Sequence, residues 1–139
     1  MTKGLRRQVY LSGAIHASDD PWSWRDDLID EYGYINFISP VDIQDSAVVN
    51  NREERYNRKW EVVMNDLRSI ALSDAMLVYY EQDVETYGTP IECFYAWMSG
   101  VPVIVYSEVE KKDMPLFLLC FSDFISDDIE DCVEKTIVV

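Results

Sequence analysis

Basic residues are scarce in this chain, and their scarcity excludes one large class of partners. Among 139 residues, 12 lysines and arginines stand against 26 aspartates and glutamates, which gives a formal net charge of -14. Such a surface repels a phosphate backbone, so we expect no nucleic-acid polymer as a partner. A small anion fits this chain only where helix N-termini or a few arginines create a local positive site.

Histidine and cysteine are too few for a metal site or a disulfide framework. His16 is the only histidine in the sequence. The three cysteines, Cys93, Cys120 and Cys132, are odd in number and form no CxxC pair. We therefore expect reduced thiols that pack in the protein, and no bound metal.

Long apolar runs are also missing. No stretch approaches the length of a membrane span, and the apolar segment between Met1 and Ile15 is too short for a secretion signal. We therefore expect a cytoplasmic protein with no membrane partner. Because 48% of the residues are apolar, the chain can bury a core of its own, and residues 1–139 are predicted to form a single domain.

Short apolar runs alternate with amphipathic segments along the sequence. Continuous apolar and β-branched runs predict buried strands, whereas apolar residues at helical spacing predict helices. The predicted strands are residues 8–12, 35–38, 75–80 and 101–106, and the predicted helices lie within 20–32, 53–72, 90–99 and 127–135. Residues 115–124 are apolar and fit either kind of element.

This alternation predicts an α/β fold in which helices cover both faces of a parallel sheet. Ligands of such folds bind beyond the carboxyl ends of the strands. The turns that follow Leu11, Ile38, Tyr80 and Tyr106 should therefore border a binding site.

The run Gly88–Trp97 admits two interpretations. In the first, Thr89, Pro90 and Glu92 form a capping box, and Glu92 only caps its own helix. The local pattern alone favours this cap. In the second, Glu92 lies near the start of a helix at the binding edge of the sheet, where the helix dipole and free N–H groups stabilise its ionised form.

An ionised carboxylate in that position suits a nucleophile. It can attack the anomeric carbon of a sugar and form a covalent ester, as in retaining glycosidases. Asp66, at the border of the apolar stripe of residues 53–72, could then supply a proton to the leaving group. Tyr10, near the same edge of the sheet, could hold Glu92 through its hydroxyl.

Three short motifs follow one another in the sequence. They are Tyr10-Leu11-Ser12-Gly13-Ala14-Ile15, then Asn65-Asp66-Leu67 with Ile70 and Ser73-Asp74-Ala75, then Gly88-Thr89-Pro90-Ile91-Glu92 with Ala96 and Gly100-Val101-Pro102-Val103. Each is weak alone, but together and in this order they resemble the nucleoside 2-deoxyribosyltransferase family, over most of the chain from Val9 to Tyr106. The resemblance implies a flavodoxin-like or Rossmann-like three-layer fold with a central parallel sheet. It also implies cleavage of the N-glycosidic bond of 2′-deoxynucleosides without a metal or organic cofactor.

The resemblance assigns roles to individual residues. Glu92 matches the nucleophile, Asp66 an acid that contacts the base or sugar, and Tyr10 the tyrosine that orients the nucleophile. The residues expected to bind a deoxynucleoside or deoxynucleotide are Ser12, Gly13, Ala14, Ile15, His16, Thr86, Gly88 and Thr89. Trp22 and Trp24 are secondary candidates for stacking on a base, although tryptophans at a helix start are more often part of a core.

The family includes base exchange between deoxynucleosides and hydrolysis of deoxynucleoside 5′-monophosphates. We predict transfer of the sugar from Glu92 to another base, with the 5′-monophosphate N-glycosidase activity as an alternative. The hydroxyl of Thr86 before a helix N-terminus favours an anion, whereas Phe117 stands where either group usually places a polar residue. A non-catalytic nucleotide-binding module, in which Glu92 is only a cap, is the other alternative. The resemblance further implies a homodimer or larger homo-oligomer, with residues 115–121 as the contact segment.

Overall fold

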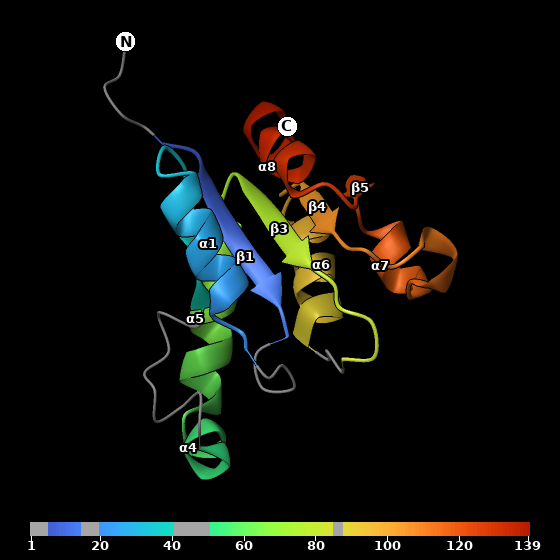
Figure 1. Ribbon diagram of the computed structural model, residues 1–139. Coiled ribbons are helices and arrows are strands. Elements are labelled where there is room, and N and C mark those ends of the chain that lie inside the picture. Colours follow the sequence, from blue (N-terminus) through green and yellow to red (C-terminus); the bar gives the residue numbers. More distant parts are fainter. Residues whose placement is uncertain (1–5, 15–19, 41–50, 85–87) are drawn as a thin grey trace.

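One parallel sheet forms the centre of the fold (Figure 1). The computed structural model describes residues 6–14, 20–40, 51–84 and 88–139. Its strands are β1 (Gln8–Gly13), β2 (Asn36–Ile38), β3 (Ala75–Tyr79), β4 (Val103–Tyr106) and β5 (Phe124–Ser126). They pair in parallel in the order β2-β1-β3-β4-β5, which is the order of flavodoxin-like sheets. The predicted α/β fold with a central parallel sheet is therefore confirmed.

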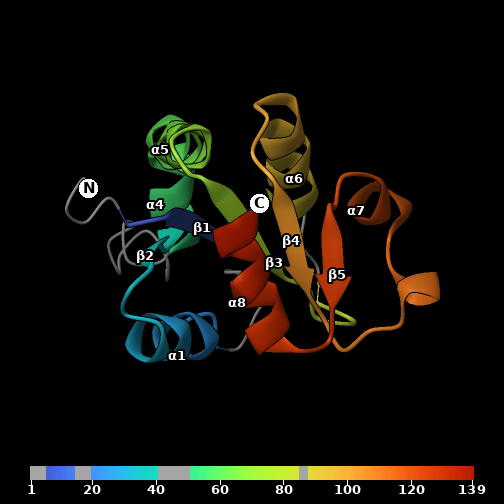
Figure 2. The ribbon, with the colours of Figure 1, turned by 90° about the horizontal axis from the view of Figure 1, so that it is seen from above.

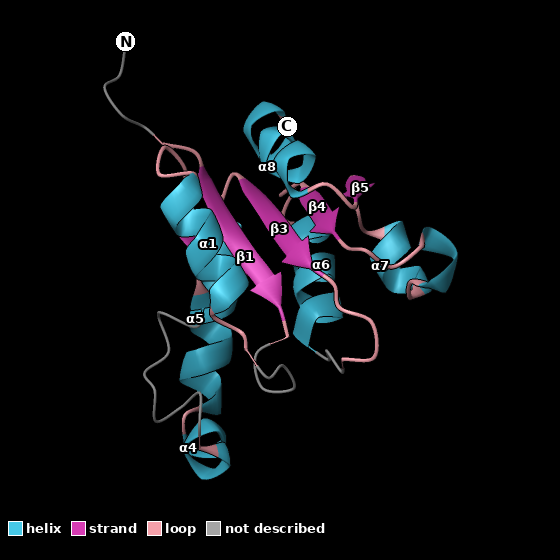
Figure 3. Ribbon diagram, viewed as in Figure 1, coloured by secondary structure: helices cyan, strands magenta, loops and turns pink. Residues whose placement is uncertain are grey.

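Helices cover both faces of this sheet (Figures 2 and 3). One layer consists of α1 (Ser23–Glu31) and α8 (Ile129–Val138). The other contains α5 (Lys59–Ala71), α6 (Gly88–Met98) and α7 (Leu116–Cys120), with α4 (Arg52–Asn57) before α5 and the short 3-10 helix η1 (Lys111–Asp113) before α7. No helix in the described ranges has the length and apolar character needed to cross a bilayer.

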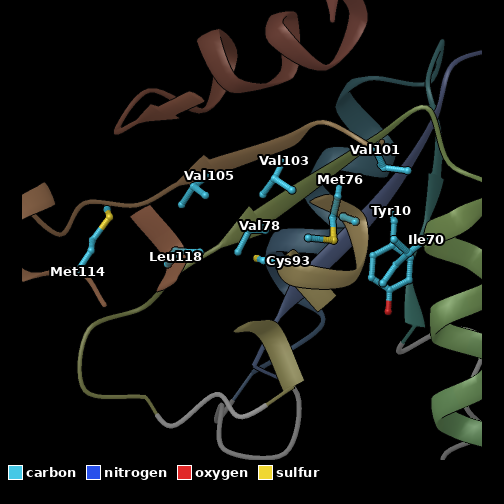
Figure 4. Close-up of a cluster of buried hydrophobic side chains, with 11 residues drawn as sticks. Tyr10, Ile70, Met76, Val78, Cys93, Val101, Val103, Val105, Met114 and Leu118 are labelled. Atoms are coloured by element: carbon cyan, nitrogen blue, oxygen red, sulfur yellow. The ribbon is translucent and has the colours of Figure 1, made fainter. Parts of the chain in front are cut away.

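Alternation along β1 divides its side chains between the two layers. Val9 and Leu11 pack with α1 and α8, whereas Tyr10 packs with Ile70 of α5 and with α6 (Figure 4). All four of these side chains are fully buried, and burial of each large apolar side chain contributes about 1.5–3 kcal/mol. Ser12 lies two residues after Tyr10 on the strand, so its side chain points to the same face of the sheet, and both hydroxyls lie on the face that α5 and α6 cover.

The prediction of one continuous helix over residues 53–72 is wrong. The segment forms α4 and α5, and Arg58 lies between them with φ -110° and ψ 20°. The guanidinium of Arg58 contacts the carboxylate of Glu61 in the first turn of α5 at 2.6 Å. Only the C-terminal half of the apolar stripe reaches the core, because Ile70 is buried while Trp60 is 74% exposed. The helical period continues across the break, so the pattern alone did not reveal it.

Residues 115–124, whose sequence fitted either a helix or a strand, contain a helix and the first residue of a strand. α7 ends at Cys120, and β5 then begins at Phe124 as the edge strand beside β4. Between them, Asp123 accepts a hydrogen bond from the backbone N–H of Val103 at 2.8 Å. This bond fixes the short return of the chain to the sheet.

Candidate active site

The carboxylate of Glu92 is held by two hydroxyls of the neighbouring strand β1. Tyr10 Oη donates a hydrogen bond to Glu92 Oε2 at 2.6 Å, and Ser12 Oγ donates one to Oε1 at 2.7 Å. Both donors are fully buried, and the glutamate is partly buried. The expected contact between Tyr10 and Glu92 is therefore present, and both carboxylate oxygens have fixed partners at one edge of the sheet.

The capping-box interpretation of Glu92 is wrong. α6 begins at Gly88, so Thr89 lies inside the helix and Glu92 falls in its second turn. Among the described residues, the carboxylate accepts hydrogen bonds from Tyr10 and Ser12, which lie far away in sequence. Two buried hydroxyls require acceptors, and Glu92 is the acceptor that the fold brings to them.

Asp66 of α5 contributes a second carboxyl group to this site. Its Oδ1 atom is buried and has no hydrogen-bond partner among the described residues. Burial and the nearby charge of Glu92 raise the pKa of Asp66 to about 7, against a smaller lowering by Arg25. At neutral pH, this carboxyl is therefore divided between its protonated and ionised forms.

The two carboxyl groups differ in what stabilises their charge. The pKa of Glu92 is raised above its ordinary value, because burial outweighs the lowering by the hydrogen bonds from Tyr10 and Ser12 and by the charge of Arg25. The charge of Arg25 also lowers the pKa of Asp66, but the Oδ1 atom of Asp66 accepts no hydrogen bond from the described residues. The hydrogen bonds that stabilise the charge of Glu92 come from β1. Because burial and Glu92 raise the pKa of Tyr10 well above its usual value, its hydroxyl remains a hydrogen-bond donor.

Arg25 of α1 is a site residue that the sequence analysis missed. It is only 1% exposed. Its Nη1 donates to the carbonyl of Pro21 at 2.6 Å, and its Nη2 donates to the carbonyl of Gly13 at 3.2 Å. The guanidinium also lies 4.5 Å from the centre of the Trp24 ring. A signal was available, because Arg25 lies three residues before the buried Leu28 on the inward face of its helix.

Gly13, predicted to line the substrate, is a tightly packed position at the end of β1. A Cβ atom there would lie 3.1 Å from the carbonyl oxygen of Tyr79 and 3.1 Å from Cζ2 of Trp24. The backbone oxygen has little freedom to move, so the absence of a side chain permits this approach of β1 to β3. Trp24 in turn packs edge-on against Tyr79, with ring centres 5.3 Å apart, and thus belongs to the core.

The other residues predicted to bind substrate are only partly described. Ala14 follows β1 and is partly exposed, and Gly88 is exposed at the start of α6, whereas Thr89 is buried. Ser12 is also fully buried and contacts Glu92. Ile15, His16 and Thr86 lie outside the described residues.

The cysteines are unpaired thiols that stand apart from this chemistry. Cys93 and Cys132 are buried, and Cys120 is exposed. Burial raises the pKa of the Cys93 and Cys132 thiols to about 12, so both stay protonated. In the part of the chain that the structure describes, no three His, Cys, Asp or Glu side chains gather in a way that could hold a metal ion.

Solved structures of known enzymes share the fold of this chain. A 2-deoxyribosyltransferase of Bacillus psychrosaccharolyticus matches with a TM-score of 0.72 at 18% identity, over 89% of this chain and 88% of that one. A 2-deoxyribosyltransferase of Leishmania mexicana matches with a TM-score of 0.63 at 15% identity, over 93% of this chain and 95% of that one. A CMP N-glycosidase of Clostridium botulinum matches with a TM-score of 0.52 at 17% identity, over 93% of this chain and 97% of that one.

Sequence comparison adds no relative to these structural matches. Neither protein-family models nor the sequences of characterised proteins give a match. The likeness to the solved structures extends over nearly the whole length of both chains in each pair, and at these identities it shows the shared fold.

Proposed function

We propose that the protein cleaves the N-glycosidic bond of a 2′-deoxynucleoside and transfers the deoxyribosyl group to another base. The observation that carries this proposal is the held carboxylate of Glu92, fixed by Tyr10 and Ser12 beside the second carboxyl group of Asp66. The fold shared with 2-deoxyribosyltransferases supports it. The rival interpretation as a non-catalytic binding module was motivated by a Glu92 helix cap and by Phe117, and it loses the first of these supports because Glu92 accepts hydrogen bonds from β1 instead.

In the first step, the carboxylate of Glu92 attacks C1′ of the sugar. A C1′–O ester bond forms, the C1′–N bond breaks, and its electron pair leaves with the base. Protonated Asp66 gives its proton to the departing base and becomes ionised. Tyr10 and Ser12 fix the attacking oxygens, which removes the need to organise them in the transition state.

In the second step, a nitrogen of another base attacks C1′ and displaces the carboxylate of Glu92. The C1′–O ester bond breaks, a new C1′–N bond forms, and Asp66 takes up the proton that the incoming base loses. No net oxidation or proton release accompanies the exchange. The alternative activity, hydrolysis of a deoxynucleoside 5′-monophosphate, differs in that water takes the sugar from the ester.

The environments of the two carboxyl groups support this division of roles. Enzymes that use a pair of carboxyls keep one protonated as the acid and the other ionised as the nucleophile. Glu92 receives two hydroxyl hydrogen bonds that favour its ionised form, and Asp66 has a pKa raised to about 7 that favours its protonated form near neutral pH.

The activity is tested by incubating the protein with one deoxynucleoside and a different free base. Chromatography of the products should show the exchanged deoxynucleoside together with the released base. Free base and free sugar without exchange would contradict transfer and identify a hydrolase. No turnover across all common bases, with and without a 5′-phosphate, would contradict both activities.

The outer surface of α6 and α7 supports a second proposal, self-association. We define the α6–α7 face by its exposed apolar side chains, which are between 43% and 77% exposed: Ile91, Phe94, Trp97, Met98, Leu116 and Phe117. Two of its aromatic rings pack against Phe121, whose ring centre lies 5.3 Å from that of Phe94 and 5.2 Å from that of Trp97. The two helices contain a single charged residue, Glu92, which points inward.

We propose that a second copy of the chain covers the α6–α7 face. Three of its six exposed apolar side chains are aromatic, and large aromatic side chains are typical anchors of protein interfaces. The net charge of -14 opposes approach of two copies elsewhere, whereas this uncharged face allows it. The predicted contact segment 115–121 contains α7 and includes Leu116 and Phe117 of this face.

Replacing Trp97 with glutamate should convert the assembly to monomers, because an unpaired charge would be buried at the contact. Sedimentation of the wild type should give at least twice the monomer mass, and of the variant the monomer mass. Trp60→Glu is the matched control, because Trp60 is an exposed tryptophan of α5 outside this face. A monomeric wild type, or an unchanged mass for Trp97→Glu, would contradict the proposed contact.

A further inference from the structure

Arg25 of α1 contacts the carboxyl end of β1. It belongs to α1, which covers the face of the sheet opposite to α5 and α6. Its Nη2 atom nevertheless reaches the carbonyl of Gly13, the last residue of β1. Gly13 directly follows Ser12, which donates to Glu92. The guanidinium therefore holds the strand end that presents one of the two hydroxyl donors of Glu92.

Burial of this guanidinium requires compensation. A charged group taken out of water costs several kcal/mol unless other groups offset that cost. Two backbone carbonyls and the face of the Trp24 ring offset part of it. The charge of Arg25 also acts on the carboxyl groups of Glu92 and Asp66, and it lowers the pKa of both.

In the described part of the chain, the titratable groups that interact with Glu92 come from four elements. Tyr10 of β1 and Cys93 of α6 stay neutral, because the pKa of each is raised. Asp66 of α5 adds negative charge when it ionises, and Arg25 of α1 supplies positive charge. Among these described neighbours, Arg25 is thus the group that balances a pair of carboxyls in a strongly acidic chain.

We propose that Arg25 is a positioning residue that holds the end of β1 against Glu92 and thereby favours the ionised form of its carboxylate. The inference rests on the proposed function for its catalytic meaning, but its electrostatic part is independent of turnover. A guanidinium that served only to fill space in α1 would influence stability without changing how the carboxyls titrate. This difference separates the two interpretations.

The test is an NMR titration of carboxyl-labelled protein, with Glu92 and Asp66 assigned through their amide variants. Arg25→Met removes the charge, and both carboxyl pKa values should rise by about 1 unit, the lower end of the effect of a nearby opposite charge. Arg25→Lys should rescue most of the shift. Trp24→Phe, which keeps the charge and alters its packing, should titrate like the wild type. In active protein, the pH optimum of kcat/KM should rise in Arg25→Met by a similar amount.

Arg25→Gln provides a second neutral variant with side-chain donors. If loss of charge destabilises the fold, the proposal expects the loss to be greater at about pH 8, where the carboxyls ionise, than at about pH 5. Equal destabilisation at both pH values would overturn the proposal. So would unchanged carboxyl titration in a folded neutral variant, or a shift in Arg25→Lys as large as in Arg25→Met. Absence of turnover with shifted titration would contradict the proposed function alone.

Discussion

Replacing Glu92 with glutamine should abolish deoxyribosyl transfer while leaving the fold intact. The amide keeps the size of the side chain and an oxygen that can accept from Tyr10 or Ser12, but it has no anionic oxygen to attack C1′. Loss of a covalent nucleophile should lower kcat by a factor of about 10⁴ or more. Chromatography of the exchange reaction measures this loss, and circular dichroism measures the fold.

Glu134→Gln is the matched control for this substitution. Glu134 is an exposed residue of α8, so the same chemical change there should leave turnover within a factor of about two of the wild type. Turnover in Glu92→Gln within tenfold of the wild type would exclude Glu92 as the nucleophile. A glutamine-containing variant that still binds nucleoside but does not react would agree with the proposal.

Replacing Asp66 with asparagine should make the protein more stable at high pH. The pKa of Asp66 is about 7 in the folded protein, against an ordinary value of 3.8. The folded state therefore binds more protons than the unfolded state between these values, and the free energy of unfolding falls as pH rises through them. Asparagine cannot ionise and avoids this loss, so the free energy of unfolding of the variant should exceed that of the wild type by about 4 kcal/mol at pH 8 and by less than about 1 kcal/mol near pH 4. Denaturant titrations at both pH values measure the difference.

The same substitution should slow the first chemical step. Without a proton donor, the base departs with its full negative charge, and the rate should fall about 10²- to 10⁴-fold. The decline of activity above pH 7 that ionisation of Asp66 causes should disappear in the variant. Asp131→Asn, at an exposed position of α8, is the control. An active Asp66→Asn, or one that is less stable than the wild type at pH 8, would exclude a protonated Asp66 from the mechanism.

Sequence patterns predicted the elements that bury a continuous face. The runs that became β1, β3 and β4 are apolar on both sides because helices cover both faces of the sheet, and this signal does not depend on distant contacts. The break at Arg58 was invisible, since the helical period continues through it. The edge strand β5 was hidden too, because three residues beside a short helix carry too little pattern.

The candidate site was only partly predictable for a related reason. Whether Glu92 caps its own helix or accepts from β1 depends on which donors the fold brings near, and local spacing cannot decide between them. The alternation along β1 did place Tyr10 and Ser12 on one face, a signal that could have paired Ser12 with Glu92. The position of Arg25, three residues before Leu28, marks the inward face of α1, but its backbone carbonyl partners cannot be found from the sequence.

The central claim is that the sugar becomes bonded to Glu92 during turnover. It is tested most directly by quenching the protein with acid during turnover, digesting it with a protease, and measuring by mass spectrometry the mass of the peptide that contains residue 92. The proposal predicts an added mass of one deoxyribosyl group on this peptide, lost on addition of a free base and absent in Glu92→Gln. Steady turnover with an unmodified peptide, or the same added mass on another residue, would contradict it.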